Sequence, residues 1–518
     1  MEAASLRRGV GETFAQSLAE AVRARSRAFW IVVGLTMFAA ALRFATLGLQ
    51  SYHHDEVVTA SRILRGSFGH AMDAVGFSES APPLYYALAW GWTQVTGTGE
   101  WGLRALSAVA GVATVPVVYL IGLELRGRRA GLMAAALAAV NPMLLWYSQE
   151  ARAYALLALF CALSLLYFLR AQRYGRRRDL TLWGVFSALA LATHYFALFP
   201  IAAEILLLAR RRGRESLRGL WIIAVACLLL APLAIHQMSY GHAEWIGVFS
   251  LGHRLWETAA TFVSGETGDI IGQPERPPLA FIPLGLCLTA FALLALRGDR
   301  DERRAAGLPL TVGAIALGIP VALALISSSK DYVLARNLLP ALIPLLVVVA
   351  IGLTLPAAKR LGAIVAAGLV VYSLGFSIAA SALPQFQRPD WDAVASRLGP
   401  PEGPHGAPSP RAMVTWTLGE APLRYYLSTG SFQVRAAERI PWMVSEVDLI
   451  SQGNAPRPVQ NMLGPRFTPS GSESVGPLLI RRYSTPGPGL APLRLRRLRH
   501  ADLNFRTNGV LMDGVGPG

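Results

Sequence analysis

Long apolar stretches that alternate with short basic connections are the dominant pattern of this chain. An α-helix needs about 20 mostly apolar residues to cross the hydrocarbon core of a bilayer, and about eleven segments reach or approach that length. These candidate spans cover residues 28–48, 103–124, 128–147, 150–170, 180–196, 197–210, 218–237, 279–296, 307–327, 335–356 and 361–381. The pattern therefore predicts a polytopic α-helical membrane protein whose multi-span domain covers residues 28–381.

The positions of the basic residues predict the orientation of these spans. Lys and Arg accumulate in short cytoplasmic loops, and basic clusters occupy alternate connections between the candidate spans. The clusters lie near residues 126–129, 173–178, 210–218, 297–304 and 359–360. We therefore expect these connections and the N-terminal segment, residues 1–27, in the cytoplasm. The outer loops 49–102 and 238–278, and the chain from residue 382 onward, are then expected outside the cytoplasmic membrane.

This orientation requires that the apolar segment Pro82–Val95 does not cross the bilayer. The segment is short, opens with Pro82-Pro83 and carries two tyrosines and two tryptophans. Such an aromatic helix is typical of the membrane interface. The alternative is a twelfth, short span, which would place the basic cluster Arg126–Arg129 on the outside.

The last part of the chain has a different character. After Leu383, Pro and Gly become frequent and the apolar runs shorten, and residues 382–518 have the length of one small domain. The pattern predicts helices over 390–398 and 421–427 and strands over 412–417, 432–436 and 478–483. We expect a small α/β or α+β domain outside the membrane.

Composition excludes a single soluble globule. Of the 518 residues 53% are hydrophobic and 15% are charged, whereas soluble domains carry about 25% charged residues. The net charge of +16 would also suit nucleic-acid binding, but the arginines lie in the predicted cytoplasmic loops, so we expect no nucleic-acid partner. The three cysteines fall in different apolar segments without Cys-x-x-Cys spacing, which argues against disulfides and structural zinc. Segment 28–48 is longer than the apolar core of a signal peptide and indicates an uncleaved first span.

The first polar cluster with chemical potential is His53-His54-Asp55-Glu56, just after the first span. Adjacent carboxylates can act as a general base or bind a divalent cation, and the histidines can share either role. The alternative is a helix cap, because acidic residues stabilise a helix N-terminus.

The second cluster is the polar turn that follows Asn141-Pro142 and contains Glu150, Arg152 and Tyr154. Charged residues so close to the hydrocarbon are costly unless they are paired or face a watery cavity, which favours a site. A carboxylate and a guanidinium there can hold a sugar hydroxyl and a phosphate, respectively. The alternative is a simple interfacial pair between Glu150 and Arg152.

Two further polar clusters lie between later candidate spans, at connections that we expect on the outer side of the membrane. One contains His194, and the other contains Lys330 and Arg336. A single histidine at a helix end is more commonly an interfacial residue than a catalyst, and this alternative stays open for His194. All four clusters are nevertheless expected on one side of the membrane, as a lipid-anchored anionic substrate requires.

These motifs, in this order, resemble the GT-C superfamily of membrane glycosyltransferases, in the bacterial branch related to protein O-mannosyltransferases and lipid A aminoarabinose transferases. The resemblance covers roughly residues 28–380. It rests on His54-Asp55-Glu56, Ala81-Pro82-Pro83-Leu84-Tyr85-Tyr86, Arg104-Ala105-Leu106-Ser107, the segment from Asn141 to Tyr154, Thr193-His194-Tyr195-Phe196, and Arg336 with Leu339-Pro340.

The resemblance implies transfer of a sugar from a polyprenyl-phosphate donor to a lipid, glycan or protein acceptor on the outer face of the cytoplasmic membrane. It also implies that Asp55 is the catalytic base. Family members often carry an acidic residue or His just before the Pro-Pro pair; here Glu79-Ser80-Ala81 precedes it, with Ala81 in the usual His position. That departure puts a metal site at the Pro-Pro helix in doubt.

Chemistry refines these assignments. The enzyme must activate an acceptor hydroxyl and neutralise charge on the departing phosphate, and a single displacement with one base would invert the anomeric centre. We expect catalysis by Asp55 with Glu56 and Glu150. Donor binding is expected from Arg152, Tyr154, His194, Lys330 and Arg336. A divalent cation is an optional cofactor, with His54, Glu56 and Glu150 as candidate ligands.

Two other functions are consistent with many spans. A secondary transporter typically shows internal repeats and charges near the midplane, whereas the charges here gather at one interface. An envelope polysaccharide polymerase or ligase would differ in its acceptor and would use the same side of the membrane.

Overall fold

The computed structural model describes most of the 518-residue chain. The described residues are 27–240, 246–266, 280–327, 331–399, 410–427, 432–433, 442–452, 463–486, 489–493, 498 and 508–513. Residues 1–26 of the expected cytoplasmic segment, and Lys330, lie outside them.

Helices account for every predicted span. They are residues 27–44, α5 (Glu100–Arg126), α6 (Arg128–Val140), α7 (Pro142–Ser148), α8 (Tyr154–Tyr174), α9 (Arg177–Thr193), α10 (Leu198–Arg212), α11 (Leu217–Met238), α13 (Phe281–Arg297), α14 (Arg300–Ile326), α15 (Leu342–Leu353) and α16 (Lys359–Ala382). Among the described residues, 7 helices are long and apolar enough to cross a membrane, or 8 if α6 and α7, which meet at 55°, form one broken span. The predicted multi-span helical fold is confirmed, and the number of spans stays a prediction.

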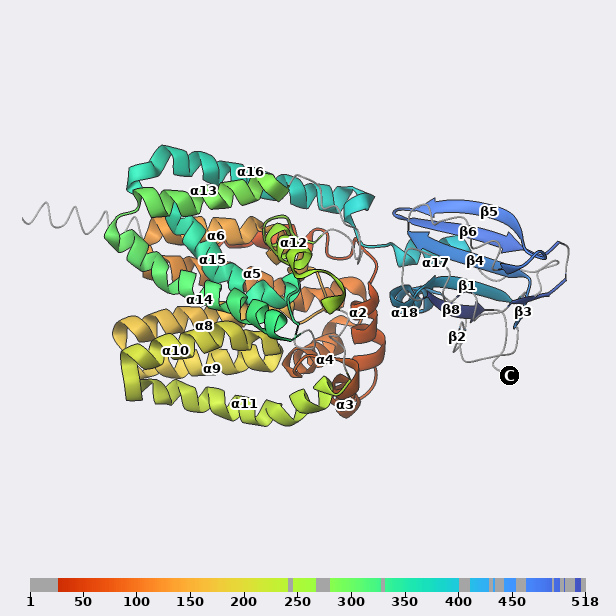
Figure 1. Cartoon of the computed structure of the whole chain (residues 1–518), viewed down its shortest axis with the longest axis horizontal. Coiled ribbons are helices and arrows are strands. Elements are labelled where there is room, and N and C mark those ends of the chain that lie inside the picture. Colours follow the sequence, from red (N-terminus) through yellow and green to blue (C-terminus); the bar gives the residue numbers. More distant parts are fainter. Residues whose placement is uncertain are drawn as a thin grey trace, which may run out of the picture.

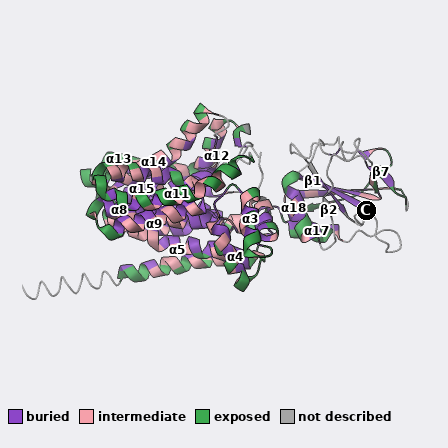
Figure 2. Cartoon of the chain, turned by 90° about the horizontal axis from the view of Figure 1, so that it is seen from below, coloured by how far each residue is buried: buried purple, intermediate pink, exposed green. Residues whose placement is uncertain are grey.

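The outer surface of the bundle is apolar, as a lipid-facing surface must be. On α11, Trp221, Leu228 and Leu229 are all more than 70% exposed. Exposed apolar residues of this size on a long helix indicate contact with hydrocarbon. Figure 2 shows the buried residues concentrated inside the bundle, with the helix at residues 27–44 on its edge.

Small residues allow the innermost helices to approach closely. A Cβ atom added at Gly122 of α5 would lie 2.7 Å from the Cα atom of Gly131 in α6. Glycine at both positions therefore lets the two backbones touch, a common arrangement between membrane helices.

Shorter helices cover one end of the bundle. They are α2 (His54–Val57), the π-helical turn η1 (Val58–Ile63), α3 (Phe68–Ser78), α4 (Leu84–Thr96) and α12 (Leu251–Ser264). The predicted interfacial segment Pro82–Val95 corresponds to α4, whose 13 residues are too few to cross a bilayer. Figure 1 places α2, α3 and α4 at the end of the bundle that faces the C-terminal domain.

The C-terminal domain is a mixed α/β unit, as predicted. Its helices are α17 (Trp391–Leu398) and α18 (Thr417–Tyr426), and its main sheet has the strand order β2-β8-β1-β4-β6-β5. Among the strands that the structure describes in this sheet, only β1 and β4 pair in parallel. The strands are β1 (Arg411–Trp416), β2 (Phe432–Gln433), β4 (Glu446–Gln452), β5 (Thr468–Val475), β6 (Leu478–Ser484) and β8 (Asn508–Asp513), and β3 (Trp442–Val444) pairs with β7 (Ala491–Leu493).

The two ends of the bundle differ. Figure 1 shows the C-terminal domain beyond the end that carries α2 and α4, whereas the connections between α10 and α11 and between α13 and α14 lie at the opposite end. Two of the predicted cytoplasmic basic clusters lie in these connections. These two basic clusters are thus separated from α2, which carries the first polar cluster, by the length of the helices.

Candidate active site

The first polar cluster lies at the end of the bundle that faces the C-terminal domain. Asp55 and Glu56 are neighbours in α2, which continues directly into the π-helical turn η1. Turns of this kind are frequent at functional sites. Because α2 is so short, contacts from other segments must fix the two carboxylates.

Glu56 is completely buried and every oxygen has partners. Its Oε1 accepts from Arg104 Nε and from the backbone nitrogen of Ala151, both at 2.8 Å. Its Oε2 accepts from Arg104 Nη2 at 2.7 Å, and it lies 2.9 Å from His53 Nδ1 and 3.2 Å from Arg388 Nη1. The Glu56 carboxylate therefore ties α2 to α5 and to the turn before α8.

Asp55 has a different environment from its neighbour. Its side chain is 30% exposed, and Oδ2 lies 3.4 Å from Nη1 of Arg336, which is itself 28% exposed. Burial by itself raises the pKa of the Asp55 carboxyl, but the positive charges of Arg152 and Arg336 outweigh burial and hold that pKa below its usual range. Asp55 is therefore an ionised, accessible carboxylate beside an accessible guanidinium.

A capped break between α6 and α7 brings Glu150 to the charged cluster around Glu56. Asn141 Oδ1 accepts from the backbone nitrogen of Leu144 at 3.0 Å, and Pro142 occupies the first helical position of α7. The chain then turns after Ser148, and Glu150 is buried there with Oε1 3.8 Å from His53 Nε2. Arg388 Nη2 donates to its other oxygen, Oε2.

Arg152 does not pair with Glu150. It forms a bidentate ion pair with Glu79, which follows α3, at 2.8 and 2.7 Å, and it also donates to Thr59 Oγ1 at 3.3 Å. The alternative of a local Glu150–Arg152 pair is therefore wrong. Arg152 pairs with Glu79, and Glu150 pairs with Arg388.

Two further predicted site residues, Tyr154 and His194, belong to a group of packed aromatic rings. The ring of Tyr154, the first residue of α8, lies 4.7 Å from the ring of Tyr147 and 5.6 Å from that of His194. Tyr147 donates to Glu266, which follows α12. His194 is buried, and its Nδ1 accepts from the backbone nitrogen of Phe196 at 3.3 Å.

The candidate metal ligands do not converge. Among the residues that the structure describes, no group of three or more His, Cys, Asp or Glu side chains is arranged to hold a metal ion. Both oxygens of Glu56 are engaged by cations or N–H donors, and Glu150 is bound by Arg388. The site as built therefore does not fit the cation-binding role considered for His54, Glu56 and Glu150.

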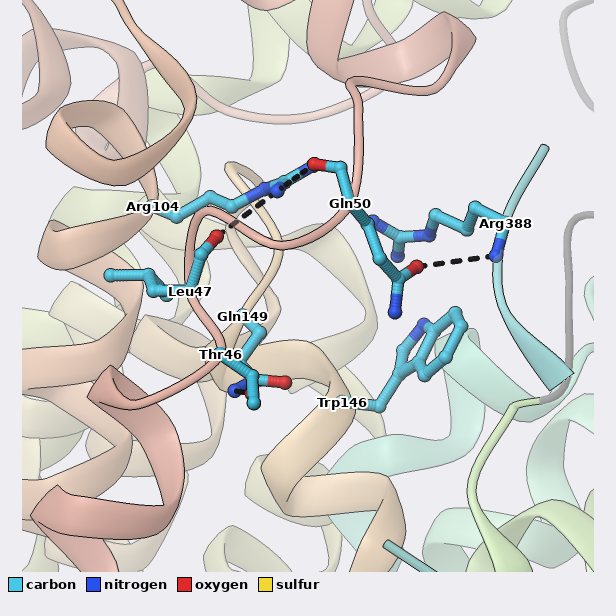
Figure 3. Close-up of a pocket in the computed structure, with 7 residues that line it drawn as sticks. All are labelled: Thr46, Leu47, Gln50, Arg104, Trp146, Gln149 and Arg388. Carbon is cyan, nitrogen blue, oxygen red and sulfur yellow. Dashed lines mark hydrogen bonds between the residues drawn. The ribbon is translucent and has the colours of Figure 1, made fainter. Parts of the chain in front are cut away.

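Sequence reasoning missed four charged residues of this cluster: Glu79, Arg104, Glu266 and Arg388. Arg104 occurs in one of the motifs that carried the resemblance, and it is buried in the apolar helix α5, a position where an arginine is costly unless it is paired. Figure 3 shows Arg104 and Arg388 approaching Gln50 from two sides, with Arg388 above Trp146. Arg388 carried no comparable sequence signal.

Residues 80–237 match the family model of dolichyl-phosphate-mannose-protein mannosyltransferase. A search of curated proteins finds no match to the chain.

Three solved structures are similar to this chain, and the first of them shares its fold. ArnT from Cupriavidus metallidurans in the apo state has a TM-score of 0.55 at 14% identity, over 88% of this chain and 98% of that chain. The same protein bound to undecaprenyl phosphate has a TM-score of 0.48 at 15% identity, over 87% and 97%. The Archaeoglobus fulgidus oligosaccharyltransferase tethered with an acceptor peptide has a TM-score of 0.46 at 14% identity, over 72% and 57%. The family-model match and the fold shared with apo ArnT confirm the resemblance of this chain to the GT-C superfamily of membrane glycosyltransferases.

Proposed function

We propose that the protein transfers a sugar from a polyprenyl-phosphate donor to a hydroxyl group of its acceptor, with Asp55 as the general base. The observation that carries this proposal is the contrast between two adjacent carboxylates. Glu56 is fully buried and bound by arginines, whereas Asp55 is 30% exposed beside an equally accessible Arg336. One accessible carboxylate and one accessible cation are the minimum that such a transfer requires.

The proposed step is a single displacement. An Asp55 carboxylate oxygen takes the proton of the acceptor hydroxyl while the acceptor oxygen forms a bond to the anomeric carbon. The bond between that carbon and the phosphate oxygen breaks, and the electron pair leaves with the phosphate. Attack from the face opposite the leaving group inverts the anomeric centre.

Arg336 is the best placed residue to bind the donor phosphate. The Arg336 side chain is 28% exposed and lies 3.4 Å from Asp55, whereas the Arg152 side chain is 12% exposed and forms a bidentate pair with the buried Glu79. A phosphate that binds Arg336 would draw this guanidinium away from Asp55. Because that guanidinium lowers the pKa of Asp55, donor binding would make the carboxylate a stronger base.

An apolar cavity that reaches the turn carrying Arg336 supports a lipid-linked donor. The cavity has a volume of about 310 Å³ and is lined by α6, α12, α13, α14, α15 and α16, with Phe262, Cys287 and Leu338 among its residues. Leu338 lies two residues after Arg336 in the turn η7 (Ala335–Ala341). An accessible cation and an apolar cavity that meet at the same turn suit a substrate with an anionic head and a hydrocarbon tail.

We further propose that the site and the C-terminal domain face the extracytoplasmic side of the cytoplasmic membrane. The support is the charge asymmetry of the bundle, because the basic connections lie at the end opposite the site (Figure 1). The acceptor would then be a lipid, glycan or protein of the cell envelope.

The proposal is tested by reconstituting the protein in vesicles with radiolabelled polyprenyl-phosphate hexoses and pentoses and a total membrane extract as the source of acceptor. We expect one donor to lose its sugar to a new product while free polyprenyl phosphate accumulates in equal amount. Failure of every lipid-linked donor, together with transfer from a nucleotide sugar, would overturn the proposed donor class.

A further inference from the structure

The segment that joins the membrane bundle to the C-terminal domain runs directly along the first outer loop. The backbone nitrogen of Arg388 donates to Gln50 Oε1 at 3.2 Å. Ser51 Oγ donates to the carbonyl of Pro389 at 3.1 Å and accepts from the backbone nitrogen of Trp391 at 2.9 Å. This linker is therefore bound to the residues that immediately precede α2.

The side chain of Arg388 enters the charged cluster. It is only 5% exposed, its Nη1 lies 3.2 Å from Glu56 Oε2, and its Nη2 donates to Glu150 Oε2. Its guanidinium carbon lies 4.6 Å from the centre of the Trp146 ring, a cation–π arrangement. Among the described residues, Arg388 is the arginine that contacts both carboxylates.

Electrostatics explains why such a cation is needed. Glu56 and Glu150 are both buried and approach the same guanidinium, so without it their negative charges would repel each other in a poorly solvated region. His53 lies between the same carboxylates, and Glu266 is a further negative group nearby. Burial raises the pKa of Glu150, Glu56 and Glu266 add to that rise, and Arg388 and His53 oppose it.

A second contact ties the C-terminal domain to the same loop. The Tyr426 hydroxyl of α18 accepts from the backbone nitrogen of Tyr52 at 2.7 Å and donates to Glu100 Oε1 at 2.5 Å. The ring of Tyr425 lies 5.8 Å from that of Tyr52. The loop just before Asp55 is thus held by the domain at one point and by its linker at another.

From these contacts we propose that Arg388 is a positioning residue, through which the C-terminal domain fixes the geometry of α2 and of the turn that carries Glu150. This inference rests on the proposed function, in which Asp55 of α2 is the base. Arg388 is buried and contacts Glu56 and Glu150, so it acts through these two carboxylates. The C-terminal domain is then an integral part of the catalytic unit, whatever acceptor it meets.

The test compares Arg388→Gln with Arg388→Lys, with the double variant Arg388→Gln/Glu150→Gln, and with Arg424→Gln, an exposed arginine of α18, as a matched control. We expect Arg388→Gln to lower kcat by about 10- to 100-fold, because a displacement of about 1 Å at a site costs about this much. The KM for the donor should change less than threefold. Arg388→Lys keeps the charge and should retain more activity.

Two readouts separate positioning from a direct role. In Arg388→Gln the buried carboxylate of Glu150 lacks its compensating cation. The kcat of this variant should therefore recover partly as pH falls from 8 to 6, when the carboxylate takes up a proton. The kcat of the double variant should be partly restored already at pH 8. A large rise in donor KM with unchanged kcat would instead make Arg388 a donor ligand and overturn the proposal. Wild-type kcat in Arg388→Gln would overturn it as well.

Hydrogen exchange provides an arm that does not depend on transfer. Amides of residues 50–57 should exchange at least tenfold faster in Arg388→Gln than in wild type or Arg424→Gln, and the double variant should restore slower exchange. If wild-type protein transfers no sugar but these rates change as expected, the proposed function fails while the positioning role stands. Unchanged exchange in both Arg388→Gln and Arg388→Lys would contradict the positioning role.

Discussion

The two neighbouring carboxylates of α2 should respond to substitution in opposite ways, and Glu56→Gln is the sharper case. Glu56 is completely buried and receives charge-assisted contacts from Arg104 at 2.7 and 2.8 Å and from Arg388 at 3.2 Å. The amide removes the negative charge and turns one acceptor oxygen into a donor that faces other donors. Removing one partner of a buried ion pair costs about 3–5 kcal/mol, so we expect the free energy of unfolding to fall by about this amount.

Reversible unfolding by SDS in mixed micelles measures this change. Glu215→Gln is the matched control, because Glu215 is 58% exposed and 3.8 Å from Arg212, and a pair in such a position contributes about 1 kcal/mol or less. Asp55→Asn should also unfold like wild type. A Glu56→Gln variant within about 1 kcal/mol of wild type would refute the view that Glu56 anchors α2.

Three further outcomes follow from the site. Arg336→Gln removes a charge that lowers the pKa of Asp55, so the acidic limb of the pH profile of kcat/KM should move to higher pH; a limb at unchanged or lower pH would contradict the assigned ion pair. Glu79→Gln leaves Arg152 without its bidentate partner and should lower the unfolding free energy by about 3 kcal/mol, measured by the same SDS titration. Cys287→Trp fills part of the apolar cavity and should raise the KM of a long-chain donor but not that of a short-chain analogue. Cys227→Trp is the control, because Cys227 does not line the cavity. Equal effects of Cys287→Trp on both donors would argue against a binding site for the lipid tail in this cavity.

The membrane helices were predictable because the signal for each is local. A run of about 20 apolar residues must satisfy its backbone within one helix, so α5 or α16 can be located from composition alone. The aromatic helix α4 was separable from the spans by its length. In the C-terminal domain α17, β1 and β6 were predicted well, but β4 and β8 were missed. Both missed strands pair with β1, and pairing between segments far apart in sequence leaves no local signal.

The site was predictable only in part, for the same physical reason. The sequence identified Asp55, Glu150 and Arg152 as charges that need partners at a membrane surface, but it could not identify the partners. Arg388 and Glu150 are 238 residues apart, and Arg104 and Glu56 are 48 apart. Such pairings are determined by how loops from different helices meet in space. The hydrophobic periodicity of the sequence carries no information about these contacts.

Turnover of purified Asp55→Asn, compared with wild type and with Asp73→Asn, tests the central claim most directly. Asp73 is an exposed carboxylate in α3, which follows α2 and η1 in the chain. The amide cannot accept the acceptor's proton, and loss of a general base lowers the rate by about 10²- to 10⁴-fold. We therefore predict that Asp55→Asn binds the polyprenyl-phosphate donor and unfolds like wild type but transfers its sugar at least 100-fold more slowly, while Asp73→Asn retains full activity. Transfer by Asp55→Asn at the wild-type rate would contradict the account.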